Sequence, residues 1–242
     1  MISVIIPTYN EIARKEEMIN HLNSIDDFFH KRNKDYELII VLDGPTDGTR
    51  EFLIKHLKDN KNSMIIDRKI NKGKGFSIRE GMLSAKGEII LFTDMDGATP
   101  IHMLDDFLQY FDENTILIGS RDLDKNSVKK HQPKWKELLG DLGNLMIQYV
   151  LDLKGIKDTQ CGFKVFSKQA VKEIMPRTTV SRWGIDFEIL VIGKKLGYKI
   201  KEIPVEWADS GESLVGISGY INTLKDLFNT KMKLIKGVYK LK

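Results

Sequence analysis

Short apolar runs alternate with longer amphipathic segments along the first half of the chain. The runs are rich in β-branched residues and predict strands over 3–6, 37–42, 64–66, 88–93 and 116–119. The segments between them predict helices over 16–29, from near Asp47, over 76–84 and after Pro100, whose fixed φ suits a first helical position. This alternation is typical of an α/β fold with a mostly parallel central sheet flanked by helices, as in nucleotide-binding domains.

The pattern changes beyond residue 120. A polar, lysine-rich stretch over 121–134 predicts a loop, helical spacing returns over 135–153 and 184–196, and 199–207 alternates like a half-buried strand. Residues 218–242 hold six lysines and one acid, Asp226, among apolar residues at near-helical spacing. Such a basic amphipathic helix can lie on anionic lipid or pack on the core with its lysines exposed, and the sequence leaves both open.

Composition narrows the class of protein. The chain has 242 residues, of which 41% are hydrophobic and 30% charged, so it can bury a core and is not disordered. The single cysteine, Cys161, excludes an intrachain disulfide and any multi-cysteine metal site, and it is consistent with a reducing compartment. We expect no signal peptide and no membrane-spanning helix, since no apolar stretch reaches about 18 residues. The net charge of +4 favours anionic partners without distinguishing phosphate, lipid and nucleic acid.

An acidic turn, Asp94-Met95-Asp96-Gly97, follows the apolar run at 88–93. In α/β domains ligands bind beyond the carboxyl ends of the strands, so both carboxylates are expected to face the binding crevice. Mg²⁺ and Mn²⁺ prefer oxygen ligands, and Mg²⁺ often takes one or two carboxylates together with substrate phosphates. The turn therefore indicates a divalent cation and a phosphorylated substrate, although a solvated turn has the same spacing.

Polar residues also follow the other predicted strands. The first strand runs into Pro7-Thr8-Tyr9-Asn10-Glu11, and the second into Asp43-Gly44-Pro45-Thr46-Asp47-Gly48-Thr49. Asp43 could accept hydrogen bonds from a nucleobase or simply form the turn, while Asp47 is expected to cap the next helix. Asn71-Lys72-Gly73-Lys74-Gly75 offers backbone amides and two ammonium groups to an anion at a helix start, with Arg79 one turn farther on.

These segments together resemble the family 2 glycosyltransferases, whose nucleotide-sugar-binding fold is called GT-A. The resemblance covers nearly the whole chain, and the motifs occur in the family's order. One departure is Leu42, because the family commonly has two adjacent aspartates at this point and Asp43 would have to contact uracil alone. The segments 97–99, 119–121, 154–164 and 182–188 look like the dolichyl-phosphate β-glucosyltransferase group, and Asp158-Thr159-Gln160-Cys161-Gly162-Phe163-Lys164 is the most specific of them.

The resemblance implies an inverting transfer of a hexose, with glucose from UDP-glucose expected, to a polyprenyl or dolichyl phosphate. It assigns catalysis to Asp94, Asp96 and Arg121, and a Mg²⁺ or Mn²⁺ ion to the two aspartates. Nucleotide-sugar binding is assigned to Pro7, Tyr9, Glu11, Asp43, Lys72, Lys74, Arg79, Asp94, Met95 and Asp96. Acceptor binding is assigned to Arg121, Lys136, Asp158, Gln160, Arg182, Trp183 and Asp186.

A phosphate acceptor removes the need for a general base, because its second pKa is about 6 and it arrives ionised. An acceptor hydroxyl would need one, and Asp186 or Glu188 would then be the candidates. Cys161 is expected to be a packed small hydrophobe, and Trp183 a sugar platform or part of the core.

We expect a single domain over 1–242, with a nucleotide-sugar-binding half over 1–120, an acceptor-binding half over 121–217 and the basic helix over 218–242. The expected location is the cytoplasm, peripherally on the cytoplasmic face of a membrane, with no nucleic-acid partner. The alternatives are GDP-mannose as donor, a sugar hydroxyl as acceptor, and a non-catalytic nucleotide-sugar or lipid-binding protein. A sugar-1-phosphate nucleotidyltransferase would need a glycine-rich loop where Pro7 to Glu11 has no glycine.

Overall fold

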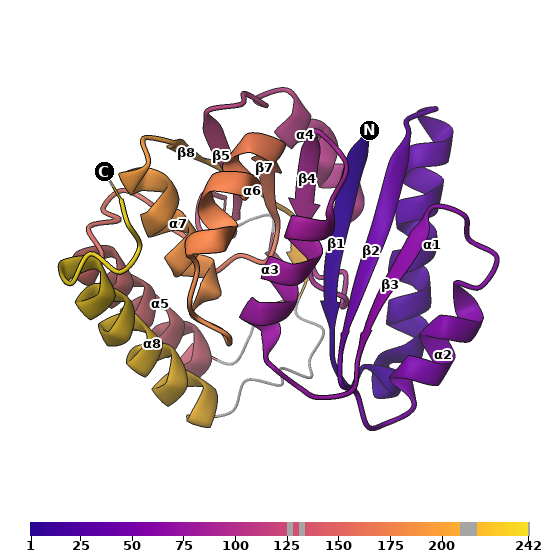
Figure 1. Cartoon of the computed structure of the whole chain (residues 1–242), viewed down its shortest axis with the longest axis horizontal. Helices are drawn as coiled ribbons and strands as arrows, with labels where there is room; N and C mark the ends of the chain where they lie inside the picture. The colour runs from indigo at the N-terminus through magenta and orange to yellow at the C-terminus, as the bar shows by residue number, and fades with distance from the viewer. Residues whose placement is uncertain (125–127, 131–133, 209–216, 242) are drawn as a thin grey trace.

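A seven-stranded sheet runs through the centre of the protein, with helices on both faces (Figure 1). The computed structural model describes residues 1–124, 128–130, 134–208 and 217–241, without the side chains of 128–130, 134–137, 217 and 218. The sheet has the order β3-β2-β1-β4-β7-β5-β8. Its strands are β1 (Ile2–Thr8), β2 (Tyr36–Asp43), β3 (Ser63–Arg68), β4 (Ile89–Phe92), β5 (Thr115–Ser120), β7 (Lys164–Ser167) and β8 (Lys199–Pro204). All neighbours are parallel except β7, which is antiparallel to β4 and β5, so the predicted mostly parallel sheet is confirmed.

Successive residues of the central strands point to opposite faces of the sheet, and each face has its own hydrophobic cluster. Ile5 and Ile39 pack with α3 (Lys74–Ser84), α6 (Lys168–Ile174) and α7 (Ile185–Lys195). Ile6 and Ile40 pack with α1 (Lys15–Lys31), α2 (Thr49–His56) and α4 (Leu104–Leu108). Because both faces are covered, these strands are apolar at nearly every position, which is why they read as continuous runs. Short 3₁₀ turns are η1 (Ile12–Arg14), η2 (Ile101–Met103) and η4 (Met175–Arg177).

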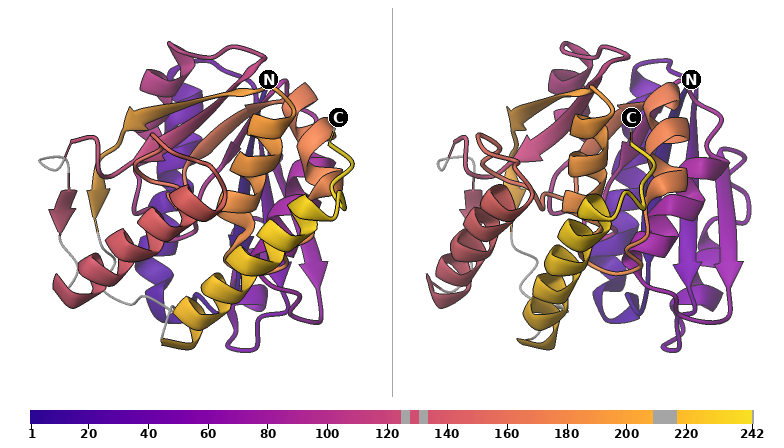
Figure 2. Two further views of the ribbon diagram at one scale, coloured as in Figure 1. Left: turned by 90° about the vertical axis from the view of Figure 1, so that its left-hand side faces the viewer. Right: turned by 60° about the vertical axis from the view of Figure 1, so that its left-hand side comes forward.

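Two long helices, α5 (Lys134–Val150) and α8 (Ile217–Ile235), lie side by side at one end of the molecule (Figure 2). Leu227 on α8 is 1% exposed and belongs to the cluster that contains α7, so one side of the terminal helix packs on the core. The prediction of a loop over 121–134 is wrong at β6 (Val128–Lys130), because β9 (Trp207–Ala208) supplies a distant partner strand. Within the described residues no helix has both the length and the apolar character to cross a bilayer.

Candidate active site

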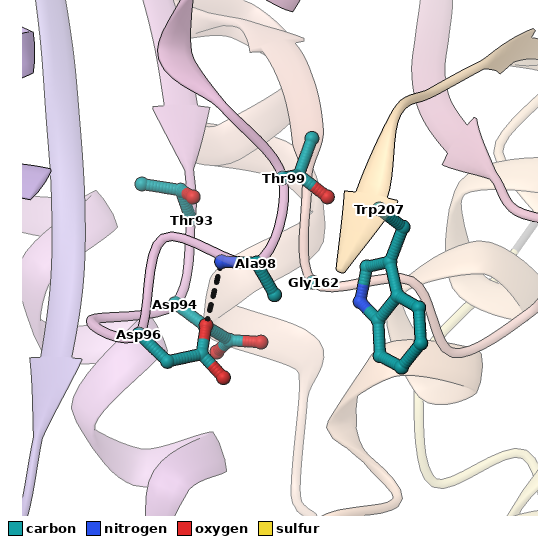
Figure 3. Close-up of a pocket in the computed structure, with 7 residues that line it drawn as sticks. All are labelled: Thr93, Asp94, Asp96, Ala98, Thr99, Gly162 and Trp207. Atoms are coloured by element: carbon teal, nitrogen blue, oxygen red, sulfur yellow. Dashed lines mark hydrogen bonds between the residues drawn. The ribbon is translucent and has the colours of Figure 1, made fainter. Parts of the chain in front are cut away.

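Asp94 and Asp96 lie in the turn that follows β4, and their side chains face a pocket (Figure 3). The pocket is lined by Thr93, Asp94, Asp96, Ala98, Thr99, Gly162 and Trp207. Asp96 Oδ1 accepts a hydrogen bond from the Ala98 N–H at 3.1 Å, which fixes the turn, and Asp96 Oδ2 lies 3.7 Å from a guanidinium nitrogen of Arg14. The two carboxylates predicted to face the crevice therefore do share one pocket.

Acidic side chains outnumber basic ones around this turn. Burial, and then the charge of Asp94, raise the pKa of Asp96. Burial also raises the pKa of nearby Glu11 to about 7; Arg14 opposes the shift, and Asp96 and Asp94 add to it. A divalent cation would relieve this repulsion. Among the described residues no group of three or more His, Cys, Asp or Glu side chains could hold a metal. Asp94 and Asp96 thus fit an ion that takes two carboxylates and fills its other positions from substrate and water.

Lys74 supplies a positive charge beside this pocket. Its ammonium nitrogen lies 2.7 Å from Asp94 Oδ1 and 5.3 Å from the ring centroids of Phe92 and Trp183. Burial works to lower its pKa, but the carboxylates of Asp94, Asp186 and Asp96 outweigh burial and hold the pKa above its ordinary value. Lys74 is therefore a fixed cation, whereas Lys72 is exposed and lies over the ring of Phe76.

Asp43 shapes the loop that carries these lysines. Its carboxylate accepts hydrogen bonds from the backbone N–H groups of Lys72 and Gly73, at 2.7 and 2.8 Å, and from Arg68 at 2.7 Å. Gly73 has φ +98°, and an added Cβ would lie 2.3 Å from the carbonyl oxygen of Ser181. Asp43 is only 3% exposed, so the structure gives it a definite structural task, and its contact with a nucleobase stays a prediction.

The loops after β1 and β2 are tied together beside the pocket. The Glu11 N–H donates to Thr49 Oγ1 at 2.7 Å, and Asp47 accepts the Thr49 N–H at 3.0 Å. The N-cap of α2 is Gly48 and not Asp47 as predicted, so Asp47 holds the first residue of the helix from one position farther back. Tyr9 is 38% exposed and Pro7 is half-buried, which leaves the surface of both open to a ligand.

Arg79 and Glu188 hold one backbone segment, 178–180. Arg79 donates to Thr178 Oγ1 at 2.7 Å and to the Val180 carbonyl at 3.3 Å. Glu188 accepts the N–H groups of Thr179 and Val180, at 3.0 and 2.9 Å, and the Tyr239 hydroxyl at 2.8 Å. With no exposed surface and these bonds in place, Glu188 is unsuited to act as a general base.

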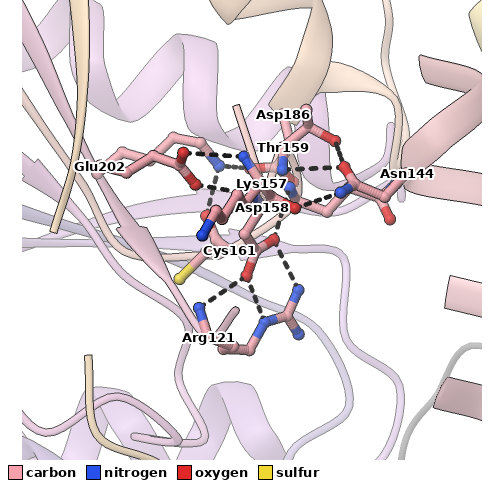
Figure 4. A network of polar contacts seen from close by, with 10 residues as sticks. Arg121, Asn144, Lys157, Asp158, Thr159, Cys161, Asp186 and Glu202 are labelled. Atoms are coloured by element: carbon pink, nitrogen blue, oxygen red, sulfur yellow. Dashed lines mark hydrogen bonds and ion pairs between the residues drawn. The ribbon is translucent and has the colours of Figure 1, made fainter. Parts of the chain in front are cut away.

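The predicted acceptor residues Arg121 and Asp158 form a bidentate ion pair (Figure 4). Arg121 Nε lies 2.6 Å from Asp158 Oδ2, and Arg121 Nη2 lies 2.9 Å from Asp158 Oδ1. Burial alone would raise the pKa of Asp158, but Arg121 holds it below its ordinary value. The backbone around Asp158 is fixed by Glu202, which accepts the Asp158 N–H at 2.9 Å, and by Asn144, which accepts the Thr159 N–H at 3.2 Å.

The turn that follows Asp158 joins the acceptor residues to the acidic pocket. The Gln160 N–H donates to Asp158 Oδ1 at 3.1 Å, and Gly162 lies against Asp94 so closely that an added Cβ would be 2.0 Å from Asp94 Oδ2. Burial raises the pKa of the Cys161 thiol to about 12, which fits a packed residue and not a nucleophile.

The remaining predicted residues lie around α7. Asp186 accepts a hydrogen bond from the fully buried Lys164, which also donates to the Cys161 carbonyl. Trp183 is half-buried near Lys74, and Arg182 is exposed, with its side chain 3.0 Å from the position of a Cβ on Gly73. The side chain of Lys136 lies outside the described residues.

Five residues of this region were not predicted from the sequence: Arg14, Asn144, Lys164, Glu202 and Trp207. Lys164 ends the 158–164 motif, but no role had been assigned to it. The contact of Arg14 with Asp96, that of Glu202 with Asp158 and the place of Trp207 in the pocket each join segments far apart in the chain, so no local motif marks them. Asn144 lies between apolar residues of α5, and a polar amide in such a position can signal a specific hydrogen bond.

Comparisons with known proteins agree with this geometry. The model of the family "Glycosyl transferase family 2" matches residues 3–175. A dolichyl-phosphate beta-glucosyltransferase of Trichomonas vaginalis is 35% identical, over 100% of this chain and 76% of that protein, and the human dolichyl-phosphate beta-glucosyltransferase is 33% identical, over 99% and 78%.

Solved structures of glycosyltransferases share the fold. The Mycobacterium tuberculosis glucosyl-3-phosphoglycerate synthase with Mn²⁺, UDP-glucose and phosphoglyceric acid gives a TM-score of 0.63 at 14% identity, covering 96% of this chain and 80% of that one. A mannosyltransferase of Pyrobaculum calidifontis with GDP-mannose and Mn²⁺ gives a TM-score of 0.65 at 17% identity, and the match covers 97% of this chain and 64% of that one. The architecture is thus the predicted GT-A fold.

Proposed function

The chain belongs to glycosyl transferase family 2, and from this premise we propose that it transfers glucose from UDP-glucose to a dolichyl or related polyprenyl phosphate, with inversion. The names of the relatives support the reaction. The observation that carries it here is the contact of Gly162 with Asp94, because it brings the acceptor-group motif and the acidic turn into one site.

Asp94 and Asp96 would hold Mg²⁺ or Mn²⁺, and two neighbouring structures that contain Mn²⁺ together with a nucleotide sugar support this assignment. When bound, such a cation offsets the negative charge that develops on a departing diphosphate. Lys74 adds a positive charge that its pKa keeps protonated, and its contact with Asp94 places that charge where the diphosphate would lie.

The residues near the pocket favour a phosphate acceptor over a sugar hydroxyl. A phosphate monoester is already ionised near neutral pH and needs no base. Glu188 is committed to backbone hydrogen bonds, and Asp186 is paired with Lys164, so neither is free to take a proton from a hydroxyl. Arg121 is fixed by Asp158 but keeps 33% of its side chain exposed, and it would attract the acceptor phosphate.

We further propose that the chain acts as one domain, peripherally attached to the membrane that holds its acceptor. Strand β7 of the second half lies between β4 and β5 of the first, which supports a single folded unit.

The reaction is tested by offering the full chain a panel of nucleotide sugars, including UDP-glucose and GDP-mannose, with a short polyprenyl phosphate in detergent and Mn²⁺ or Mg²⁺. We expect lipid-linked glucose from UDP-glucose, and none from an Asp94→Asn, Asp96→Asn double variant that keeps the wild-type circular dichroism spectrum. Transfer from GDP-mannose in place of UDP-glucose would replace the donor assignment. No transfer from any donor by folded protein would overturn the enzyme proposal.

A further inference from the structure

The outer sides of α5 and α8 expose large apolar residues to solvent. Leu138 is 70% exposed and Tyr149 is 66% exposed on α5, and Ile235 is 68% exposed on α8. Leu142 on α5 is exposed as well, and so are Phe228 and Met232 on α8. These residues recur at helical spacing, so each helix carries an apolar stripe on its outer side in addition to the side that packs inward.

The two stripes lie on one side of the molecule. Ile147 on α5 and Leu227 on α8 belong to the same buried cluster, and both views of Figure 2 show the helices running next to each other. The inner sides of the helices are thus already satisfied by the core. The outer residues together make a patch of the kind that marks a docking surface.

The charge on α8 indicates what this patch docks to. Asp226, the only acid of α8, turns inward, where its Oδ2 accepts the Gly184 N–H at 3.3 Å. Lys225 on α8 and Lys236, directly after its end, are exposed, and among the described side chains of the two helices Asp141 is the only exposed acid. A positive helix with an apolar stripe suits an anionic lipid surface, whereas two copies of this face would bring like charges together.

The patch also lies next to the proposed acceptor residues. From the inner side of α5, Asn144 Oδ1 accepts the Thr159 N–H at 3.2 Å and the Thr159 hydroxyl at 2.6 Å. Asp158, the preceding residue, holds Arg121. Contact of α5 with a membrane would therefore hold the acceptor residues close to the bilayer surface.

We propose that the outer sides of α5 and α8 form a single lipid-docking surface that seats the acceptor site on an anionic bilayer. This inference rests on the proposed function for the choice of acceptor, but the binding it describes does not depend on catalysis.

The test is co-sedimentation of the full chain with phosphatidylcholine vesicles, with and without phosphatidylglycerol. We expect binding to the anionic vesicles that weakens with added salt. The pairs Leu142→Gln with Tyr149→Gln on α5, and Phe228→Gln with Met232→Gln on α8, should each lower the partition coefficient about tenfold or more, because each removes two inserted apolar side chains. The matched control is Ile54→Gln with Leu83→Gln, two exposed apolar residues on α2 and α3, and it should bind like the wild type.

Three results would overturn the proposal: no binding of the wild type to any vesicle, unchanged binding of the α5 pair, or a wild-type dimer in sedimentation velocity that both pairs dissociate. All positions are exposed, and thermal unfolding checks that each variant is folded. Transfer to a short acceptor in detergent is measured in parallel and should stay at the wild-type rate. If it is absent in the wild type as well, the proposed reaction fails and not the docking surface.

Discussion

Replacing Gly162 with alanine would act directly on Asp94. The new Cβ would lie 2.0 Å from Asp94 Oδ2 and 2.7 Å from its Cγ, whereas real Cβ atoms essentially never approach closer than 3.0 Å. The carboxylate must therefore move by about 1 Å, the difference between 3.0 and 2.0 Å. The backbone of Gly162 is outside the left-handed region, so alanine fits its conformation and the effect comes from the contact alone.

The size of the effect follows from that displacement. A misplacement of about 1 Å in a reacting group can cost about 100-fold in rate, which corresponds to about 2.7 kcal/mol in activation free energy. The free energy of unfolding should fall by only about 1 kcal/mol, at the low end for overpacking, because Asp94 can swing into the open pocket. We therefore expect kcat/KM to fall about 100-fold in a folded protein.

The assay is transfer to a short polyprenyl phosphate in detergent, combined with a Mn²⁺ titration, in which the variant should need more metal. Gly140→Ala is the matched control, since a Cβ on this helical glycine meets no atom within 4 Å. A Gly162→Ala enzyme with wild-type kcat/KM and an unchanged Mn²⁺ requirement would refute the claim that Gly162 positions Asp94.

Three further outcomes are expected. Asp94→Asn and Asp96→Asn should each lower turnover about 100-fold or more with an unchanged fold by circular dichroism, and near-normal rates would contradict the metal role. Arg121→Lys loses the bidentate pairing with Asp158 and should raise the KM for polyprenyl phosphate about tenfold. The affinity for UDP, measured by calorimetry, should not change. An unchanged KM would remove Arg121 from the acceptor site. Burial lowers the pKa of His21 from 6.5 to about 4. The unfolded chain therefore binds the extra proton first, and stability is lost as pH falls from 6.5 towards 4, by up to about 3 kcal/mol. The free energy of unfolding of a His21→Gln variant should depend less on pH across this window than that of the wild type. If the two proteins show the same pH dependence, His21 is not the group involved.

The sequence pattern located most of the first half correctly because the determinants there are local. Buried parallel strands are apolar throughout, and each ends in a polar turn at the same edge of the sheet. This is why Asp94 and Asp96 could be placed in a common pocket before the structure was known. The pairing of Arg121 with Asp158 joins two residues that had both been assigned to acceptor binding, although no local pattern predicted that they would touch.

Long-range contacts explain what the sequence could not show. The short strand β6 exists because β9 lies beside it, and a polar, lysine-rich stretch carries no period-2 signal of its own. Helix α6 is only seven residues long and was not predicted. The contribution of Trp207 to the pocket depends on a turn of the chain far from Asp94, so neither composition nor spacing could reveal it.

The place of β7 in the sheet has a consequence for how the enzyme is made. Strand β5 has only β7 and β8 as neighbours, and both are synthesised after it. On the ribosome, strands β1 to β4 can pair as they emerge, but β5 must wait until residues 164–167 arrive. The same segment follows Gly162, which packs against Asp94. A nascent chain that ends before β7 would therefore expose an unpaired edge at β4 and lack Gly162 beside Asp94. The catalytic site is completed later still, because β8 and then Trp207, which also lines the pocket, follow β7 in the chain.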